Sequence, residues 1–254
     1  MAGTAPGFAF FGSSKSVMFR LLPALLLAFL ILSPVPAATA SPFSIPELTD
    51  AFKKTVFGLE YRSWSWRPYL VKKYSVPVRI YVHNLAKQDR THMVHQFIRD
   101  MDVKISGLKV EIAAAPDTAN FQVYVVDRAQ YQQVVLKDIF DKGEKIAPGR
   151  CLVRVISGRR GIKRSAAVIV SDEGEFLFRR CMVEEILQGL GPMNDDDSLV
   201  HSVFNDESRH SRFTVFDQIL LNMLYDPRIE PGMSLKQLET LLPQIAIDAR
   251  SRAR

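Results

Sequence analysis

The segment CMVEEILQGLGPMNDDD, residues 181–197, concentrates side chains that could take part in catalysis. Glu184 and Gln188 are four residues apart, so a helix would direct both of them from one face toward a single metal ion. Glu185 lies beside the first of them, where a carboxylate could act as the general base on a metal-bound water. The spacing is that of a metal-assisted hydrolytic site at the end of a helix.

The run EEILQGLGPMND resembles the active-site helix of the zincin metallopeptidases, whose pattern is H-E-x-x-H-x-x-G-x-x-H. Glu184 stands at the first histidine, Glu185 at the catalytic glutamate and Gln188 at the second histidine. Gly191 stands at the glycine that lets the chain leave the helix in a left-handed conformation. Asn194 stands at the third ligand. All three ligand positions are therefore substituted.

These substitutions determine the chemistry that we expect. Zinc prefers thiolate and imidazole ligands, and the amide oxygens of Gln and Asn are poor replacements in a tetrahedral site. Without a metal to lower the pKa of water, Glu185 has no activated nucleophile to assist. We therefore expect no zinc and no other cofactor. The segment is interpreted as a cleft that has lost its metal and serves for binding.

Several polar residues around this helix end form the candidate binding cleft: Glu184, Gln188, Asn194, Asp195, Asn205 and Asp206. Adjacent carboxylates in a partly buried cleft repel one another, so one of them has a raised pKa unless a positive charge compensates. Arg179 and Arg209 are the expected countercharges. Asn194 is expected to approach the side chains of Glu184 and Gln188.

A hydrolase is the alternative interpretation. It would use Glu185 with a non-standard metal site, built either from carboxylates around a hard cation or from His201 and His210 as displaced ligands beside Glu184. The aspartates 195–197 could hold calcium, but they lack the alternating spacing and central glycine of a calcium loop. A cap for the following turn is the preferred role for them.

The elements that must position this segment follow from the hydrophobic periodicity. The predicted strands are residues 76–84, 108–114, 121–127, 151–157 and 166–172. The predicted helices are residues 44–58, 89–106, 129–140, 173–191, 213–225 and 234–249. We expect one α+β domain over residues 41–254, with a mixed sheet of about five strands. The helix that carries Glu184 should pack on this sheet, next to a helical C-terminal part.

The first forty residues differ in composition from the rest of the chain. They contain Lys15 and Arg20 but no acidic residue, followed by a run of twelve apolar residues, 21–32. A bilayer span needs about 20 residues, and Ala38-Thr39-Ala40 is typical of a signal-peptide cleavage site. We predict a signal peptide over residues 1–40 and a periplasmic or secreted protein, with no stable membrane anchor after cleavage.

The chain contains two cysteines, Cys151 and Cys181, and both lie in the part predicted to be exported. Export permits oxidation, and two cysteines allow a single pairing. We therefore predict a disulfide between them. A disulfide leaves no thiolate, so neither cysteine is expected to act as a nucleophile.

The charge of the chain is only mildly basic. The full sequence has a net charge of +6, and removal of the leader leaves 31 basic against 27 acidic residues, or +4. The basic clusters at residues 158–164 and 249–254 contain no aromatic residues, unlike a groove that stacks single-stranded nucleic acid. A solvated loop and a frayed tail are expected there. The expected partner is an envelope protein or peptide, and not nucleic acid.

Three stretches resemble the signature of a family of secreted bacterial proteins catalogued as domain of unknown function 2927. They are VIVSDEGEFLFRRCMVEEILQGLGPMNDDDSL, SVFNDESRHSRFT and LYDPRIEPGM. The resemblance covers nearly all of the predicted mature chain. It implies a zincin-like fold without implying an activity, so an exported binding or scaffolding module is the first hypothesis and the hydrolase the second.

Overall fold

The computed structural model describes residues 42–58, 70–140 and 146–253. These residues belong to one compact unit, Ala40–Arg254, and the predicted signal peptide lies outside them. The strands are β1 Val78–Asn84, β2 Val110–Ile112, β3 Phe121–Val126, β4 Cys151–Gly158 and β5 Gly161–Val170. The helices are α1 Ile45–Phe57, α2 Thr91–Lys104, α3 Arg128–Val134, α4 Glu175–Gln188, α5 Val215–Leu224, α6 Leu235–Leu238 and α7 Leu242–Arg252. A 3-10 turn, η1 Pro116–Thr118, and a π turn, η2 Val135–Ile139, complete the elements.

The five strands form one mixed sheet in the order β2-β1-β3-β5-β4. β1 is parallel to both β2 and β3, and β3 is parallel to β5. β4 and β5 form an antiparallel hairpin, which places β4 at one edge of the sheet. The predicted α+β fold with a mixed sheet of about five strands is confirmed.

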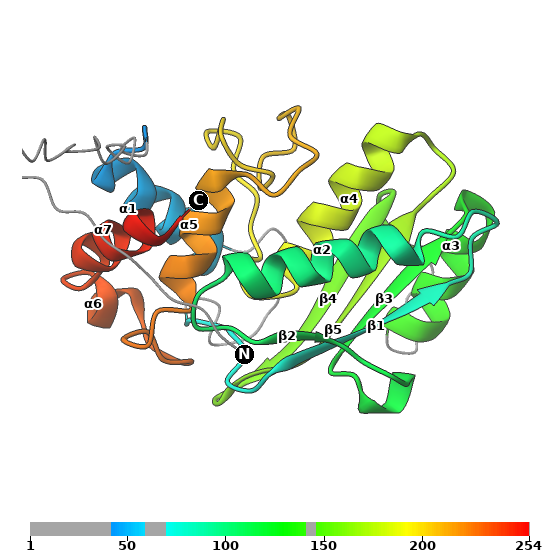
Figure 1. Ribbon diagram of the computed structural model, residues 1–254, viewed down its shortest axis with the longest axis horizontal. Coiled ribbons are helices and arrows are strands. Elements are labelled where there is room, and N and C mark those ends of the chain that lie inside the picture. Colours follow the sequence, from blue (N-terminus) through cyan, green and yellow to red (C-terminus); the bar gives the residue numbers. More distant parts are fainter. Residues whose placement is uncertain (1–41, 59–69, 141–145, 254) are drawn as a thin grey trace, which may run out of the picture. The chain divides into compact units, whose positions relative to one another are not determined.

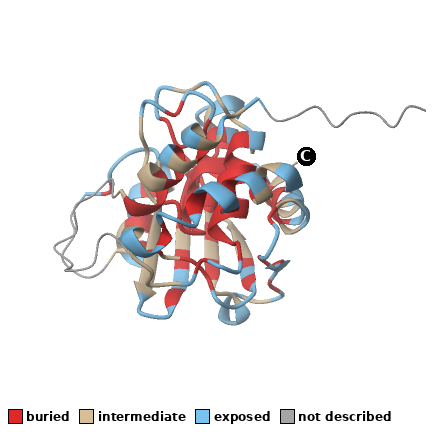
Figure 2. Cartoon of the chain, turned by 90° about the vertical axis from the view of Figure 1, so that its left-hand side faces the viewer, coloured by how far each residue is buried: buried red, intermediate tan, exposed pale blue. Residues whose placement is uncertain are grey.

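Side chains alternate between the two faces of the sheet, and each face has its own core. Phe121, Val123 and Val125 of β3 belong to the larger core, which lies under α2 and α4. Val126 belongs to a smaller core on the other face, under α3 and η2. Figure 2 shows the buried residues gathered where the helices meet the sheet. α4 is therefore a central helix.

The helical C-terminal part lies at one end of the sheet. α1, α5 and α7 contact one another there, and α6 lies beside them (Figure 1). Ser44 caps α1 with a reciprocal capping box, and Thr214 does the same for α5. These caps satisfy backbone N–H groups that have no partner within the helix.

Three expectations from the sequence need correction. The predicted helix 234–249 is divided into α6 and α7, because Pro243 cannot continue a helix but fits its first turn. The strand expected over residues 108–114 is only three residues long. The C-terminal tail is not frayed: Arg250 donates to the carbonyl of Phe43 at 2.9 Å, and Arg252 donates to Asp226 at 3.2 Å.

Candidate functional site

The corner at the end of α4 depends on two glycines. A Cβ atom at Gly189 would collide with the ring of Phe121, and one at Gly191 with the backbone carbonyl of Lys72. Gly191 also has a backbone φ of 138°, which residues other than glycine rarely adopt. The Gly-Leu-Gly sequence therefore lets α4 end against the sheet and lets the chain turn sharply toward residues 192–210.

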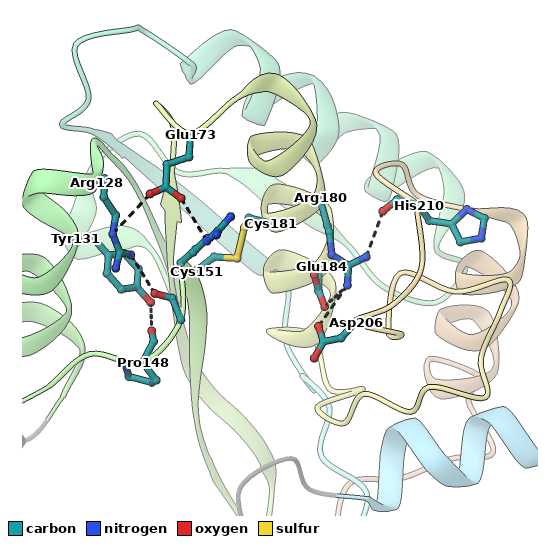
Figure 3. Close-up of a disulfide and its surroundings, with 12 residues drawn as sticks. Arg128, Tyr131, Pro148, Cys151, Glu173, Arg180, Cys181, Glu184, Asp206 and His210 are labelled. Carbon is teal, nitrogen blue, oxygen red and sulfur yellow. Dashed lines mark hydrogen bonds and ion pairs between the residues drawn. A yellow bond between two sulfur atoms is a disulfide. The ribbon is translucent and has the colours of Figure 1, made fainter.

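Arg180 is the centre of the polar network beside α4. Its buried guanidinium donates to Glu184 Oε1 at 3.2 Å and to Asp206 Oδ1 at 3.4 Å. It also donates to the Oγ of Ser208 at 3.1 Å. Backbone carbonyls accept further hydrogen bonds from it, those of Asn205 at 3.0 Å, Ser208 at 3.2 Å and His210 at 3.5 Å. Figure 3 shows Arg180 with Glu184, Asp206 and His210 on one side of α4.

Three carboxylates gather at this corner. Oxygen atoms of Glu184, Asp195 and Asp206 lie within 4.8 Å of one another. Gln188 donates to both oxygens of Asp195, at 3.0 and 2.9 Å. The structure thus brings together four of the six residues of the predicted cleft. Glu184 and Gln188 are themselves buried.

The countercharge is an arginine, but not one of the two that we expected. Arg180 forms ion pairs with Glu184 and Asp206, whereas Arg179 forms one with the exposed Glu175 at 2.7 Å. Arg179 points away because residues one apart on a helix face different directions. The i,i+4 spacing of Arg180 and Glu184 was the sequence signal that could have found this pair.

Asn194 does not occupy the position expected for a third ligand. Its Nδ2 donates to the carbonyls of Lys54 at 3.2 Å and Asp195 at 3.0 Å, so its amide is directed at the end of α1. It is Asp195, the next residue, that bonds Gln188. The expectation that Asn194 approaches Glu184 and Gln188 is replaced by this arrangement.

The candidate general base lies on another face of the helix. Glu185 is buried and follows Cys181 by four residues, so it lies on the side of α4 that faces β4. It is not one of the three carboxylates that come within 4.8 Å of each other. A catalytic role for Glu185 stays a prediction.

The two loop histidines do not join the carboxylates. The ring of His201 packs against those of Phe43 and Phe216, with centroid distances of 5.3 and 6.1 Å. The His210 Nε2 is 3.0 Å from the carbonyl of Val200, and Figure 3 shows the ring directed away from Arg180. Displaced histidine ligands beside Glu184 are therefore not found.

The loop after α4 is held by its own polar side chains. Asp196 accepts from the backbone N–H of Ser198 at 3.0 Å, which is the turn cap preferred for this aspartate. Hydrogen bonds from Ser198 lower the pKa of Asp196. Asn205, the sixth residue of the predicted cleft, donates to the carbonyl of Asp197 at 2.9 Å and accepts from the N–H of Glu207 at 2.8 Å. Its role is thus to fix the loop that carries Asp206.

Asp217, which the sequence analysis did not single out, anchors the far end of the same loop. This fully buried carboxylate accepts from Ser202 Oγ at 2.6 Å, from Thr214 Oγ1 at 2.7 Å and from the N–H of Val203. Burial raises the pKa of Asp217 to about 6. The Thr214-x-x-Asp217 spacing signals a helix cap, but no pattern shows the contacts to Ser202 and Val203.

The predicted disulfide is present. Cys151, at the start of β4, is bonded to Cys181 of α4, with 5.9 Å between their Cα atoms. Figure 3 shows it on the side of α4 opposite Arg180. It therefore fixes the edge strand of the sheet to the helix that carries the polar corner.

These features define a disulfide-bonded α+β domain with an arginine-paired carboxylate corner. Residues 46–244 match the family model described as "Protein of unknown function (DUF2927)", so the chain belongs to this family. No curated protein and no solved structure matches it. Among the described residues, no helix is both long and apolar enough to cross a membrane.

Proposed function

We propose that this protein is an exported, zincin-like domain that acts as a non-catalytic binding module of the cell envelope. The observation that carries the proposal is the position of Arg180, whose guanidinium bonds two of the three clustered carboxylates. Two features support the zincin-like relationship: the packing of the central helix α4 on a mixed sheet, and the glycine corner at the end of this helix. The disulfide supports an oxidising compartment.

The arginine favours binding over hydrolysis because of what a guanidinium can and cannot do. It compensates negative charge and fixes the loop through carbonyls 205, 208 and 210. It has no open coordination position at which water could bind and lose a proton, which is how a metal ion generates a nucleophile. We therefore assign the carboxylate corner a structural role, in which it fixes the loop after α4.

The surface that fits a partner best is the edge of the sheet at β4. Within the described residues, β4 pairs with β5 alone, and its residues 151–157 are partly exposed. An edge strand offers backbone N–H and C=O groups to an extended peptide, which can add to the sheet as a further strand. The disulfide to α4 holds this edge rigid, so the partner proposed is an extended segment of an envelope protein or peptide.

The alternative is a hydrolase that uses Glu185 with a non-standard metal site. The observation in its favour is the carboxylate cluster of Glu184, Asp195 and Asp206, because carboxylate oxygens are ligands for hard cations. A cation there would have to compete with Arg180 for Glu184 and Asp206.

Elemental analysis of protein purified from the periplasm without chelator separates the two functions. We expect no stoichiometric metal, and no peptidase activity in the native protein or in Glu185→Gln. Stoichiometric metal together with an activity that is lost in Glu185→Gln would establish the hydrolase instead.

The binding surface is tested by nuclear magnetic resonance with extended peptides from envelope proteins. Backbone amide shifts should change along β4 and remain constant on α5 and α7, whose main contacts are with each other and with α1. Shift changes confined to α3 or to α5 and α7 would contradict binding at the β4 edge.

A further inference from the structure

The face of the sheet opposite α4 carries a polar hollow that the proposed function does not use. α3 and η2 cover part of this face, and η1 also borders the hollow through Pro116 and Asp117. Between them is a cavity of about 450 Å³. This volume lies within the range of about 300–1,000 Å³ that is usual for small-molecule sites.

The floor of the hollow follows from the strand register. Gln122 of β3 and Arg154 of β4 are both paired with Ala166 of β5, so the three side chains form one row across the sheet. Ala166 has only a methyl group between two long side chains, and this leaves the depression. Ser165, the residue before it, points to the other face, where its Oγ donates to the carbonyl of Gly189.

One wall is fixed by stacking and hydrogen bonds. The rings of His83 and Tyr124 are stacked, with centroids 4.4 Å apart and planes at 5°. His83 Nε2 is 2.8 Å from Gln122 Oε1, and Gln122 Nε2 donates to the carbonyl of Pro116 at 2.7 Å. Since the Gln122 amide nitrogen is used in this way, its oxygen accepts from His83 Nε2–H. The wall is therefore preorganised before any ligand binds.

Charges of both signs line the hollow on different elements. Arg154 and Arg164 come from β4 and β5, where Arg164 faces Ile156 in the register. Arg154 Nη1 donates to the carbonyl of Ile139, which fixes it beneath η2. Asp138 comes from η2 and Asp117 from η1. Burial, followed by the charge of Asp138, raises the pKa of Tyr124.

We propose that this hollow binds a small peptidic zwitterion, with its carboxylate toward Arg154 and Arg164 and its ammonium group toward Asp138 and Asp117. Two carboxylates on the rim disfavour a plain anion such as phosphate, because like charges repel it. A sugar usually needs an open aromatic face, whereas the rings of His83 and Tyr124 stack on each other. Charges of both signs from different elements line one hollow, and this is complementary to a zwitterion.

Calorimetric titration with trialanine and its blocked forms tests the inference on the ligand side. Trialanine should bind, and N-acetyl-trialanine and trialanine amide should each bind at least about tenfold more weakly, because each lacks one charge. A single free amino acid, titrated in parallel, distinguishes a site for monomers from a site for short peptides. Equal binding of the doubly blocked peptide, binding of maltotriose, or no binding of trialanine or the amino acid up to about 10 mM would overturn the proposal.

Variants on one strand test it on the protein side. The Arg164 side chain is exposed and makes no hydrogen bond or ion pair to another described residue, so Arg164→Gln should fold normally and weaken trialanine binding at least about tenfold. Lys163→Gln removes the same charge from the adjacent, exposed position on the other side of the strand and should leave the affinity unchanged. Asp138→Asn should weaken trialanine but not N-acetyl-trialanine. If both variants weakened trialanine binding equally, the affinity would depend only on the net charge of the protein, and the proposed site would be contradicted.

Discussion

Arg180 combines two roles at the scale of single residues. It neutralises part of the charge of Glu184 and Asp206, and it fastens α4 to the carbonyls of the following loop. The sequence predicted the polar residues of this corner, because their types and helical spacing are visible. It did not predict which arginine compensates them, since that depends on how the loop folds back over the helix.

Replacing Arg180 should therefore destabilise the protein and change its response to cations. Arg180→Gln leaves Glu184 and Asp206 without their countercharge, and we expect the free energy of unfolding in urea to fall by about 3 kcal/mol. This is the low end for a broken buried pair, because the Asp206 side chain is 68% exposed. Calcium or manganese should raise the Tm of the variant but not that of the wild type.

Arg179→Gln is the matched control for this variant. Arg179 and its partner Glu175 are both about half exposed, at 46% and 49%, so the loss should stay below about 1 kcal/mol. Equal losses for the two variants, or a calcium response in neither, would show that Arg180 does not compensate the cluster.

Asp217 predicts a dependence of stability on pH. Its pKa of about 6 lies above the value of about 3.9 for an exposed aspartate. The folded state therefore binds this proton more tightly than the unfolded state, so this group raises the free energy of unfolding as the pH falls from about 6 toward 4. Asp217→Asn removes this contribution.

The measurement is urea unfolding of the wild type and Asp217→Asn at several pH values. The wild type should gain stability relative to the variant as the pH falls from 7 to 4.5. Groups with lowered pKa values, such as Asp226 and Asp196, are common to both proteins and cancel in the difference. If the difference in the free energy of unfolding between the wild type and Asp217→Asn did not change with pH, the raised pKa of Asp217 would be contradicted.

At the scale of elements, periodicity predicted most of the helices and strands but not their neighbours. The alternation in residues 121–126 and the apolar run in 166–170 suffice to identify strands. The order β2-β1-β3-β5-β4 depends on contacts between distant segments, which local patterns do not contain. The division between α6 and α7 was predictable from Pro243, because proline in a helix interior removes a hydrogen bond.

The corner after α4 should tolerate no side chain at Gly191. Gly174 also has a positive φ, 102° against 138° for Gly191, but has nothing within 4 Å of an added Cβ. Gly174→Ala should therefore cost about 1 kcal/mol of unfolding free energy, from backbone strain alone. Gly191→Ala should cost about 3 kcal/mol, because the methyl group also meets the carbonyl of Lys72. Similar losses for both variants in urea unfolding would show that the close approach is not limiting.

The disulfide should stabilise the junction of β4 and α4. It joins two cysteines that are 30 residues apart in the sequence, and closing a loop of this length corresponds to about 3–4 kcal/mol in the chain-entropy model. A Cys151→Ala, Cys181→Ala double variant should lose this amount in urea. Reductant should lower the stability of the wild type to a similar value and leave the variant unaffected, and a variant as stable as the oxidised wild type would be the contrary result.

At the scale of the whole molecule, the two ends of the described chain are joined. Arg250 reaches the carbonyl of Phe43 before α1, and Arg252 reaches the buried Asp226 after α5. Arg228 completes this network through Asp226 and Asp248. The basic composition of residues 249–254 indicated a solvated tail, and only the tertiary structure reveals the acceptors that it meets.

Deletion of residues 250–254 should therefore lower the free energy of unfolding by about 2 kcal/mol, because hydrogen bonds to two separate segments are lost. Deletion of residues 253–254 alone leaves both arginines in place and should have little effect. Thermal unfolding of the two truncated proteins compares them directly, and equal Tm values for them would contradict the anchoring role of Arg250 and Arg252.

Arg180 also determines how the carboxylate corner responds to the surroundings of the protein. A metal ion occupies a site according to mass action, so its occupancy falls when the free ion becomes scarce. A guanidinium carried by the same helix is present in every folded molecule, and arginine keeps its charge at physiological pH. In the binding module that we propose, the corner would therefore need no metal-loading step after folding, and chelators or a shortage of metal would leave it unchanged.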